Sequence, residues 1–364
     1  GNLIFIDLRD RSGLLQVVFN PKLSSSAHKN AQMLRGEWVI QVSGDVVQRI
    51  QGSENPDLPT GDIELSADKL VVISRSKTPP FEVDDDLNID DLTRLKYRFI
   101  DLRRPKMQAL LKLRHDVTRT IWNYLSNQGF IQVETPILIK STPEGARDYL
   151  VPSRLHKGQF YALPQSPQQL KQMLMVSGVE RYFQIAHCFR DEDLRADRQP
   201  EHTQLDLEMS FVHQEDVMNL VEALFSTIVK EVRPTNSLSE PFIRISYDEA
   251  MERFGTDKPD VRFGLELNSI TDIVSNLGIN VFNKTLESGG TIRSLVLPGC
   301  GYFVRKQTDE LIELAKSNGG KGLVFISIDN EINAIEKLSY ENYRSPIKKL
   351  LSVEAVKSIS NVTN

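Results

Sequence analysis

Short apolar runs, several of them alternating with polar positions, fill the first 76 residues of the chain. The pattern predicts a short helix over 27–34 and a hairpin loop over 9–13, between strands at 3–8, 14–19, 38–47, 63–65 and 70–73. Several strands with one interposed helix indicate a small β-barrel. A closed barrel of this kind needs one more strand, so we expect the chain to be truncated before Gly1.

A helical spacing replaces this pattern after Pro105. Apolar residues recur every three or four positions at Leu110, Leu113, Val117, Ile121 and Leu125. This spacing predicts one apolar helix face. Gly129 is expected to end the helix, and residues 130–134 alternate as a strand. The intervening segment 77–104 contains Pro79-Pro80 and an aspartate-rich run over 84–91, which indicate a solvated linker.

A second helix is predicted where Ser166, Pro167 and Gln169 form a capping box. Lys171 falls in its second turn, on a face that it shares with Gln168. A cation is mildly unfavourable at that end of a helix because the helix dipole is positive there. Two explanations stay open: an anionic ligand near Lys171, or a surface lysine whose charged end reaches the solvent.

Two alternating strands, over 182–190 and 205–211, enclose a polar loop at 191–204. Alternation places Arg190 on the face opposite His187, and His187 is expected to lie in the core. If the strands pair antiparallel, Arg190, Asp206 and Glu208 line one polar floor. A loop of this length inside a compact domain is more often functional than idle.

The loop carries side chains suited to a polyphosphate with its magnesium and to a stacked base: Glu192, Arg195, Arg198, Gln199 and His202. The alternative is a solvent-facing sheet edge with surface ion pairs. The six histidines show no zinc-ligand spacing. The glycine-rich segments at 299–301 and 319–322 lack residues that phosphate-binding loops require.

The composition excludes several classes of protein. The net charge of −5 excludes a uniformly basic nucleic-acid-coating protein but not a local basic site. Two cysteines are too few for a disulfide framework and fit a reducing compartment. No apolar run approaches the roughly 20 residues of a membrane span. We therefore expect a cytoplasmic protein without a membrane association.

Several motifs in order resemble the bacterial-type aspartyl-tRNA synthetases, a class II family. The motifs are Lys96-Tyr97-Arg98, Asp101-Leu102-Arg103-Arg104-Pro105, Ser141 to Pro152, Gln165-Ser166-Pro167-Gln168, Phe189-Arg190-Asp191-Glu192 and Arg195 to Pro200. The resemblance runs over most of the chain. Their shared order and spacing make the resemblance specific.

The resemblance implies an α+β multidomain protein. Its parts would be an OB-fold anticodon-binding barrel at 1–76, a hinge at 77–104, a class II antiparallel sheet flanked by helices at 105–258, and a mixed α/β insertion domain at 259–364. In the OB-fold, Phe5 would stack on an anticodon base and Gln16 would hydrogen-bond one. Residues 129–136 resemble the motif that builds a homodimer interface in this family.

The family's reaction is ATP-dependent activation of L-aspartate, followed by transfer of the aspartyl group to tRNA(Asp), with ATP and Mg²⁺ required. By resemblance, Arg190 would grip both the α-phosphate of ATP and the substrate carboxylate. Further aspartate-binding positions would be Glu144, Ser166, Gln168, Lys171 and Asp206. Further ATP-binding positions would be Asp191, Glu192, Gln199 and His202, the last standing where the family usually has a phenylalanine.

The resemblance also has a gap. The third class II motif, a glycine-rich strand and helix with an ATP-binding arginine, has no counterpart before Asn364. We therefore consider two other hypotheses beside aspartate–tRNA ligase activity. One is a non-catalytic tRNA-binding module built from the same parts, and the other is a sister synthetase specific for asparagine or lysine. Lys171 argues against the sister enzymes, because a neutral or cationic side chain has no use for that lysine.

Overall fold

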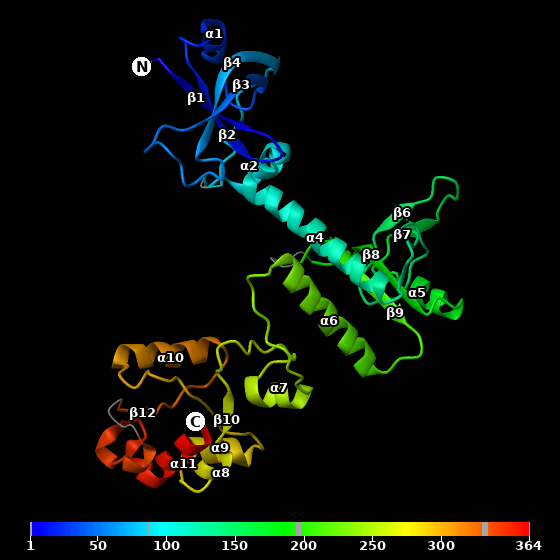
Figure 1. The fold of residues 1–364 in the computed structure, drawn as a ribbon. Coiled ribbons are helices and arrows are strands. Elements are labelled where there is room, and N and C mark those ends of the chain that lie inside the picture. The colour runs from blue at the N-terminus through cyan, green and yellow to red at the C-terminus, as the bar shows by residue number, and fades with distance from the viewer. Residues whose placement is uncertain (1, 86, 194, 196–197, 330–333, 364) are drawn as a thin grey trace. The chain divides into compact units, whose positions relative to one another are not determined.

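The computed structural model describes residues 2–85, 87–193, 195, 198–329 and 334–363. It comprises two compact units, residues 1–238 and residues 239–364 (Figure 1). The domain boundary expected from the sequence, between residues 258 and 259, lies later in the chain than this division. The four sequence-derived domain ranges stay predictions.

The first unit begins with a four-stranded sheet in the order β1-β2-β4-β3. Its strands are β1 (Ile4–Arg9), β2 (Leu14–Phe19), β3 (Val39–Gln48) and β4 (Ile63–Ser74), with helix α1 (Ser25–Ala31). Strands β2 and β4 run parallel, whereas the other neighbours are antiparallel. Val17, Phe19 and Ala67 are fully buried between the sheet and α1.

The two short strands expected at 63–65 and 70–73 form the single strand β4. It pairs with β3 along its whole length, with a shift in register between Ser43 and Gly44. A side chain at Gly44 would collide with the backbone of Ser66, so only glycine lets the two strands approach here.

The segment expected to be a solvated linker contains two short helices, α2 (Asp91–Lys96) and α3 (Arg98–Asp101). Asp101 is completely buried, and Arg94, Arg98 and Arg104 all donate hydrogen bonds to its carboxylate. Arg104 also donates to the backbone oxygen of Asp85, so the aspartate run is partly fixed to this cluster. Most described residues of the 84–91 run are exposed, as expected of a solvated segment, but Arg104 fixes part of its backbone.

A three-stranded sheet follows in the order β5-β8-β9, with β5 parallel and β9 antiparallel to β8. The elements of this part are α4 (Pro105–Asn127), β5 (Ile131–Gln132), β6 (Leu150–Pro152), β7 (Phe160–Ala162), α5 (Gln168–Val176), β8 (Arg181–Phe189), β9 (Glu201–Met209) and α6 (Gln214–Val232). Helices α4 and α6 cover one face, where Leu125, Phe183 and Leu224 form a buried core. The opposite face is left for polar side chains.

The second unit is a mixed α/β body with its own apolar cores. Its strands are β10 (Leu267–Ser269), β11 (Arg293–Leu295), β12 (Ser327–Ile328) and β13 (Tyr343–Arg344). Its helices are α7 (Tyr247–Phe254), α8 (Thr271–Val274), α9 (Asn280–Glu287), α10 (Arg305–Ser317) and α11 (Val353–Thr363), with 3₁₀ helices at Ile335–Lys337, Tyr340–Asn342 and Lys348–Leu350. Tyr343 and Val356 are fully buried in one core, and Val274 packs with Ile359 in another.

Candidate active site

The antiparallel register of β8 and β9 builds a polar floor on the face away from α4 and α6. Tyr182 lies opposite Glu208, Gln184 opposite Asp206, and Cys188 opposite His202. Directly opposite residues of an antiparallel pair point to the same face. The sequence-based prediction that Asp206 and Glu208 share one polar face with the alternate residues of the 182–190 strand is thus confirmed.

Lys171 of α5 reaches this floor. Its Nζ lies 2.9 Å from Asp206 Oδ1 and 3.2 Å from Glu208 Oε2. Only 9% of Lys171 is exposed, so the surface-lysine explanation was wrong. Burial acts to lower the pKa of Lys171, but the hydrogen bonds and negative charges of Asp206 and Glu208 outweigh it and raise the pKa. The lysine is therefore a positively charged group in a nearly buried site.

Hydrogen bonds fix the orientation of the floor. Gln204 Nε2 donates to Asp206 Oδ2 at 2.7 Å, and the Tyr182 hydroxyl donates to Gln184 Oε1 at 2.8 Å. Burial, with the nearby charge of Asp206, raises the pKa of Tyr182, so this hydroxyl stays a donor. Among the described residues, the buried Asp206 Oδ1 has the ion pair with Lys171 but no hydrogen bond of good geometry.

The segment containing Glu144 is tied to the start of α5. Ser166 Oγ donates to Glu144 Oε2 at 2.6 Å, and Thr142 Oγ1 donates to Glu144 Oε1 at 2.9 Å. The expected capping box was wrong: α5 begins at Gln168, and the Ser166 hydroxyl bonds Glu144 instead of capping the helix. A carboxylate from one loop is thereby held beside the helix that carries Lys171.

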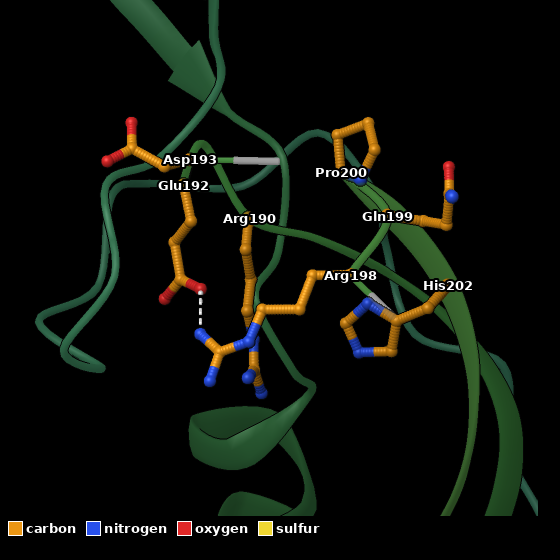
Figure 2. Close-up of a pocket in the computed structure, with 7 residues that line it drawn as sticks. All are labelled: Arg190, Glu192, Asp193, Arg198, Gln199, Pro200 and His202. Carbon is orange, nitrogen blue, oxygen red and sulfur yellow. Dashed lines mark hydrogen bonds and ion pairs between the residues drawn. The ribbon is translucent and has the colours of Figure 1, made fainter. Parts of the chain in front are cut away.

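A second site, a cavity of about 440 Å³, lies where β8 ends and β9 begins (Figure 2). Its lining residues are Arg190, Glu192, Asp193, Arg198, Gln199, Pro200 and His202. Arg198 forms an ion pair of 3.3 Å with Glu192, and Figure 2 shows Gln199 pointing away from this pair. Two arginines and two carboxylates around one cavity suit a polyphosphate with a divalent cation.

Cys188 stands between the two sites. It is fully buried, and burial raises the pKa of its thiol to about 11. Asp206 and Glu144 also raise this pKa, whereas Arg190 lowers it. Cys188 lies opposite His202 of the cavity and shares a strand face with Gln184 of the polar floor, so the two sites are neighbours on one face of the sheet.

Comparison with known proteins fits this geometry. Residues 90–347 match the tRNA synthetases class II (D, K and N). The chain belongs to this family. Residues 1–73 match an OB-fold nucleic acid binding domain. The predicted fold class, an OB-fold followed by a class II antiparallel sheet with helices, is confirmed.

The similar proteins of this family share one name. The chain is 51% identical over 360 residues to an aspartate–tRNA(Asp/Asn) ligase of Dehalococcoides mccartyi strain CBDB1, covering 99% of this chain and 60% of that protein. It is 50% identical over 364 residues to the enzyme of that name from Syntrophomonas wolfei, covering 100% and 60%. The chain thus spans about 60% of the length of these relatives.

A solved structure shares the fold. Asparaginyl-tRNA synthetase from Pyrococcus horikoshii, complexed with asparaginyl-adenylate, aligns with a TM-score of 0.60 and 25% sequence identity. The alignment covers 77% of this chain and 61% of that one.

The structure brings most residues expected at the synthetase site together, in two groups. Glu144 with Ser166, and Lys171 with Asp206, form the polar floor, while Arg190, Glu192, Gln199 and His202 line the cavity. Gln168 is the half-buried first residue of α5. Asp191 does not line the cavity; its backbone exchanges hydrogen bonds with Arg147.

Phe5 and Gln16 lie on one face of the first sheet, because Phe5 is opposite Val18 and Asp7 is opposite Gln16. Phe5 is 56% exposed. Gln16 Nε2 donates to Glu64 Oε2 at 2.9 Å. The aromatic ring is therefore available for stacking, while the amide is held by a neighbouring strand.

The sequence analysis named Gln165 in a motif but gave it no role; it is only 2% exposed and bonds the backbone of Ala146 in both directions. Its place directly before the Ser166-Pro167 pair was the available signal. His187 was misplaced: its side chain is 59% exposed and lies 3.8 Å from Glu201, because the core under the helices includes Phe183 and Ile185 but not His187.

Within the described ranges, no group of three or more histidine, cysteine, aspartate or glutamate side chains is placed to hold a metal ion. The same residues include no helix that is both long and apolar enough to cross a membrane.

Proposed function

We propose that this chain forms the aspartate- and ATP-binding part of an aspartate–tRNA ligase. The observation that carries the proposal is the nearly buried Lys171, whose ammonium group lies between the carboxylates of Asp206 and Glu208 on the floor of the site. An amino acid with an acidic side chain has three charged groups, and this site offers a partner for each. The names of the relatives that span the chain support the same substrate.

The three charged groups of aspartate have separate proposed partners. Lys171 binds the side-chain carboxylate, helped by Ser166 and Gln168. Glu144 and Asp206 bind the ammonium group, and hydrogen bonds from Ser166 and Gln204 hold the two carboxylates in place. Arg190 binds the α-carboxylate. Asparagine would bring a neutral amide to Lys171 where aspartate brings a carboxylate, which is the kind of mismatch that gives strong discrimination.

ATP occupies the cavity in this proposal. Arg190 contacts the α-phosphate, Glu192 and Gln199 contact the nucleotide, and His202 supplies an aromatic face for adenine. Asp191, whose backbone is held by Arg147, is a further proposed contact to the nucleotide. Magnesium fits here through Glu192 and Asp193, because a magnesium ion bound to substrate phosphates needs only one or two protein carboxylates.

The proposed chemistry has two steps. The α-carboxylate of aspartate attacks the α-phosphorus of ATP, giving aspartyl-adenylate and pyrophosphate, and the terminal hydroxyl of tRNA then takes the aspartyl group. No protein nucleophile is required, so the residues act by positioning and by stabilising phosphate charge. Arg190, bound to both reacting groups, contributes to each effect.

The remaining partners follow from the same proposal. Phe5 and Gln16 contact the anticodon of tRNA(Asp), which agrees with the OB-fold match and with the exposed ring. Residues 129–136 form a homodimer interface. Since charged tRNA is consumed by translation, we place the reaction in the cytoplasm.

The test is exchange of labelled pyrophosphate into ATP with aspartate, asparagine or lysine as the amino acid. Exchange with aspartate alone supports the proposal. Exchange with asparagine or lysine instead points to a sister synthetase. Lack of exchange with all three favours a tRNA-binding module without catalysis. Transfer to tRNA(Asp) and tRNA(Asn) is then measured separately, because the name of the relatives covers both.

A further inference from the structure

A basic turn joins β6 and β7, over residues 153–159, and the hairpin extends from the body of the first unit (Figure 1). It contains Arg154, His156 and Lys157, all exposed. The turn is closed by a hydrogen bond from the Ser153 amide to the Gln159 carbonyl at 2.9 Å. The three basic side chains are thus displayed together on a defined turn.

The charges of this turn are not neutralised by neighbours. In the described part of the chain, Arg154 and Lys157 form no ion pair with an acidic side chain. The sequence between Asp148 and Glu180 contains no aspartate or glutamate. On a protein with a net charge of −5, this is a local positive surface.

Apolar and aromatic side chains flank the charges. Leu155 is 79% exposed, Phe160 is 55% exposed and Tyr161 is 40% exposed. Basic side chains bind RNA phosphates, and exposed aromatic rings stack on unpaired bases. An acidic protein partner would use the charges but would leave these rings without a specific role.

The hairpin is attached directly to the candidate active site. Ile139 and Ala162 exchange backbone hydrogen bonds of 3.1 and 2.8 Å, and the Leu163 amide donates to the Tyr149 carbonyl at 2.9 Å. Gln165, three residues after Ala162, bonds the segment that carries Glu144. The turn is therefore held in a fixed relation to the residues proposed to bind aspartate.

We propose that the turn formed by residues 153–159 binds the phosphate backbone of the acceptor arm of tRNA. This inference rests on the proposed function, which requires the terminal hydroxyl of tRNA to reach the site beside Ser166. Arg154 and Lys157 each contact a phosphate, and Phe160 and Tyr161 supply stacking surfaces. The turn thereby guides the end of the tRNA toward the bound adenylate.

The test compares two RNA ligands, whole tRNA(Asp) and a minihelix of its acceptor arm, in equilibrium binding at several salt concentrations. For the double variant Arg154→Ser/Lys157→Ser, we expect about tenfold weaker binding of both RNAs. The slope of the logarithm of the binding constant against the logarithm of the salt concentration should become shallower by about 1.5 to 2. Arg305→Ser/Lys306→Ser, a matched exposed pair on α10, leaves both affinities unchanged. Phe5→Ala weakens binding of whole tRNA only.

Equal affinity of the double variant and the original chain for the minihelix overturns the proposal. A change in oligomeric state with unchanged RNA binding also overturns it and assigns the turn to a protein contact. The charge-conserving variant Arg154→Lys/Lys157→Arg retains minihelix binding if the proposal holds, which excludes misfolding as the cause of a loss. Aspartate-dependent pyrophosphate exchange needs no tRNA, so its outcome tests the proposed function separately.

Discussion

At the scale of single residues, Lys171 has an unusual position. It is the buried residue of α5, whereas the leucines of that helix are only half-buried. Breaking a buried ion pair is costly because the remaining charge loses its partner. The lysine therefore contributes to the local fold as well as to the proposed recognition of aspartate.

Replacing Lys171 by methionine keeps an unbranched side chain, one atom shorter, and removes the charge. We expect the dissociation constant for L-aspartate to rise roughly 100-fold, or about 2.7 kcal/mol, the upper range for a hydrogen bond to a charged group. Calorimetric titration of aspartate measures this, with Lys112→Met, a 79% exposed lysine, as the matched control. An unchanged dissociation constant in a folded Lys171→Met variant would remove the assigned role.

Cys188 allows a prediction about chemical reactivity. Thiolates react with iodoacetamide, and a pKa of about 11 leaves roughly one Cys188 thiolate in a thousand at pH 8. We expect the folded chain to be alkylated at Cys300 and the denatured chain at both cysteines, as read by mass spectrometry. Rapid alkylation of Cys188 in the folded chain would contradict its burial.

The raised pKa of Cys188 also has a consequence for stability. The unfolded thiol loses its proton from about pH 9.0 upward, while the folded thiol keeps its proton until about pH 11. Because the unfolded state then binds fewer protons, this group lowers the free energy of unfolding as pH rises through that window.

At the scale of elements, the buried carboxylate of Asp101 organises the connection between the first sheet and α4. Three arginines from α2, α3 and the start of α4 meet at one side chain. Arg103 of the same connection pairs with Glu37, which also pairs with Arg9 of β1. Ion pairs therefore hold the ends of these elements where apolar residues are few.

The variant Asp101→Asn tests this cluster. We expect it to lower the free energy of unfolding by about 3–5 kcal/mol at pH 7, because buried arginine charge loses its partner. Denaturant titration measures the change. Asp91→Asn serves as control, since the Asp91 side chain is 84% exposed and its pair with Arg94 contributes at most about 1 kcal/mol.

The effect of Asp101→Asn depends on pH in a defined direction. Burial acts to raise the pKa of Asp101, but the hydrogen bonds and charges of the arginines outweigh it and lower the pKa below 3.8. The stabilisation is present above pH 3.8 and is lost as pH falls through the pKa of Asp101 in the folded state. The difference in the free energy of unfolding between wild type and variant becomes smaller as pH falls through this range. A constant difference would show that the carboxylate charge is not responsible.

At the scale of the whole molecule, the division at residues 238 and 239 separates two units that each have an apolar core. Independent cores predict independent unfolding. We expect two transitions in scanning calorimetry and early proteolytic cleavage within 233–246, the stretch between α6 and α7. A single cooperative transition with no such cleavage would show that the two units unfold together.

The sequence by itself determined the features that depend on local period. Alternation over 182–190 and 205–211 specified two strands and which residues share a face, because the side-chain period of a strand is two. The second strand begins at Glu201, inside the predicted loop, and ends at Met209. The apolar spacing after Pro105 specified α4, since it follows the period of a helix. The ordered motifs specified the family. Candidate residues for aspartate and ATP came from that resemblance.

Only the tertiary structure decided how distant charges meet. Lys171 looked equally suited to the surface, and its burial depends on Asp206 and Glu208, which lie more than 30 residues later. The Ser166 hydroxyl bonds Glu144 instead of a helix end for the same reason. Arg98 and Arg104 stand three residues from Asp101, a local helical spacing, but the burial of Asp101 and its pair with Arg94 appear only in the tertiary structure. Ion pairs and buried hydrogen bonds depend on spatial neighbours, and a local sequence pattern carries no information about them.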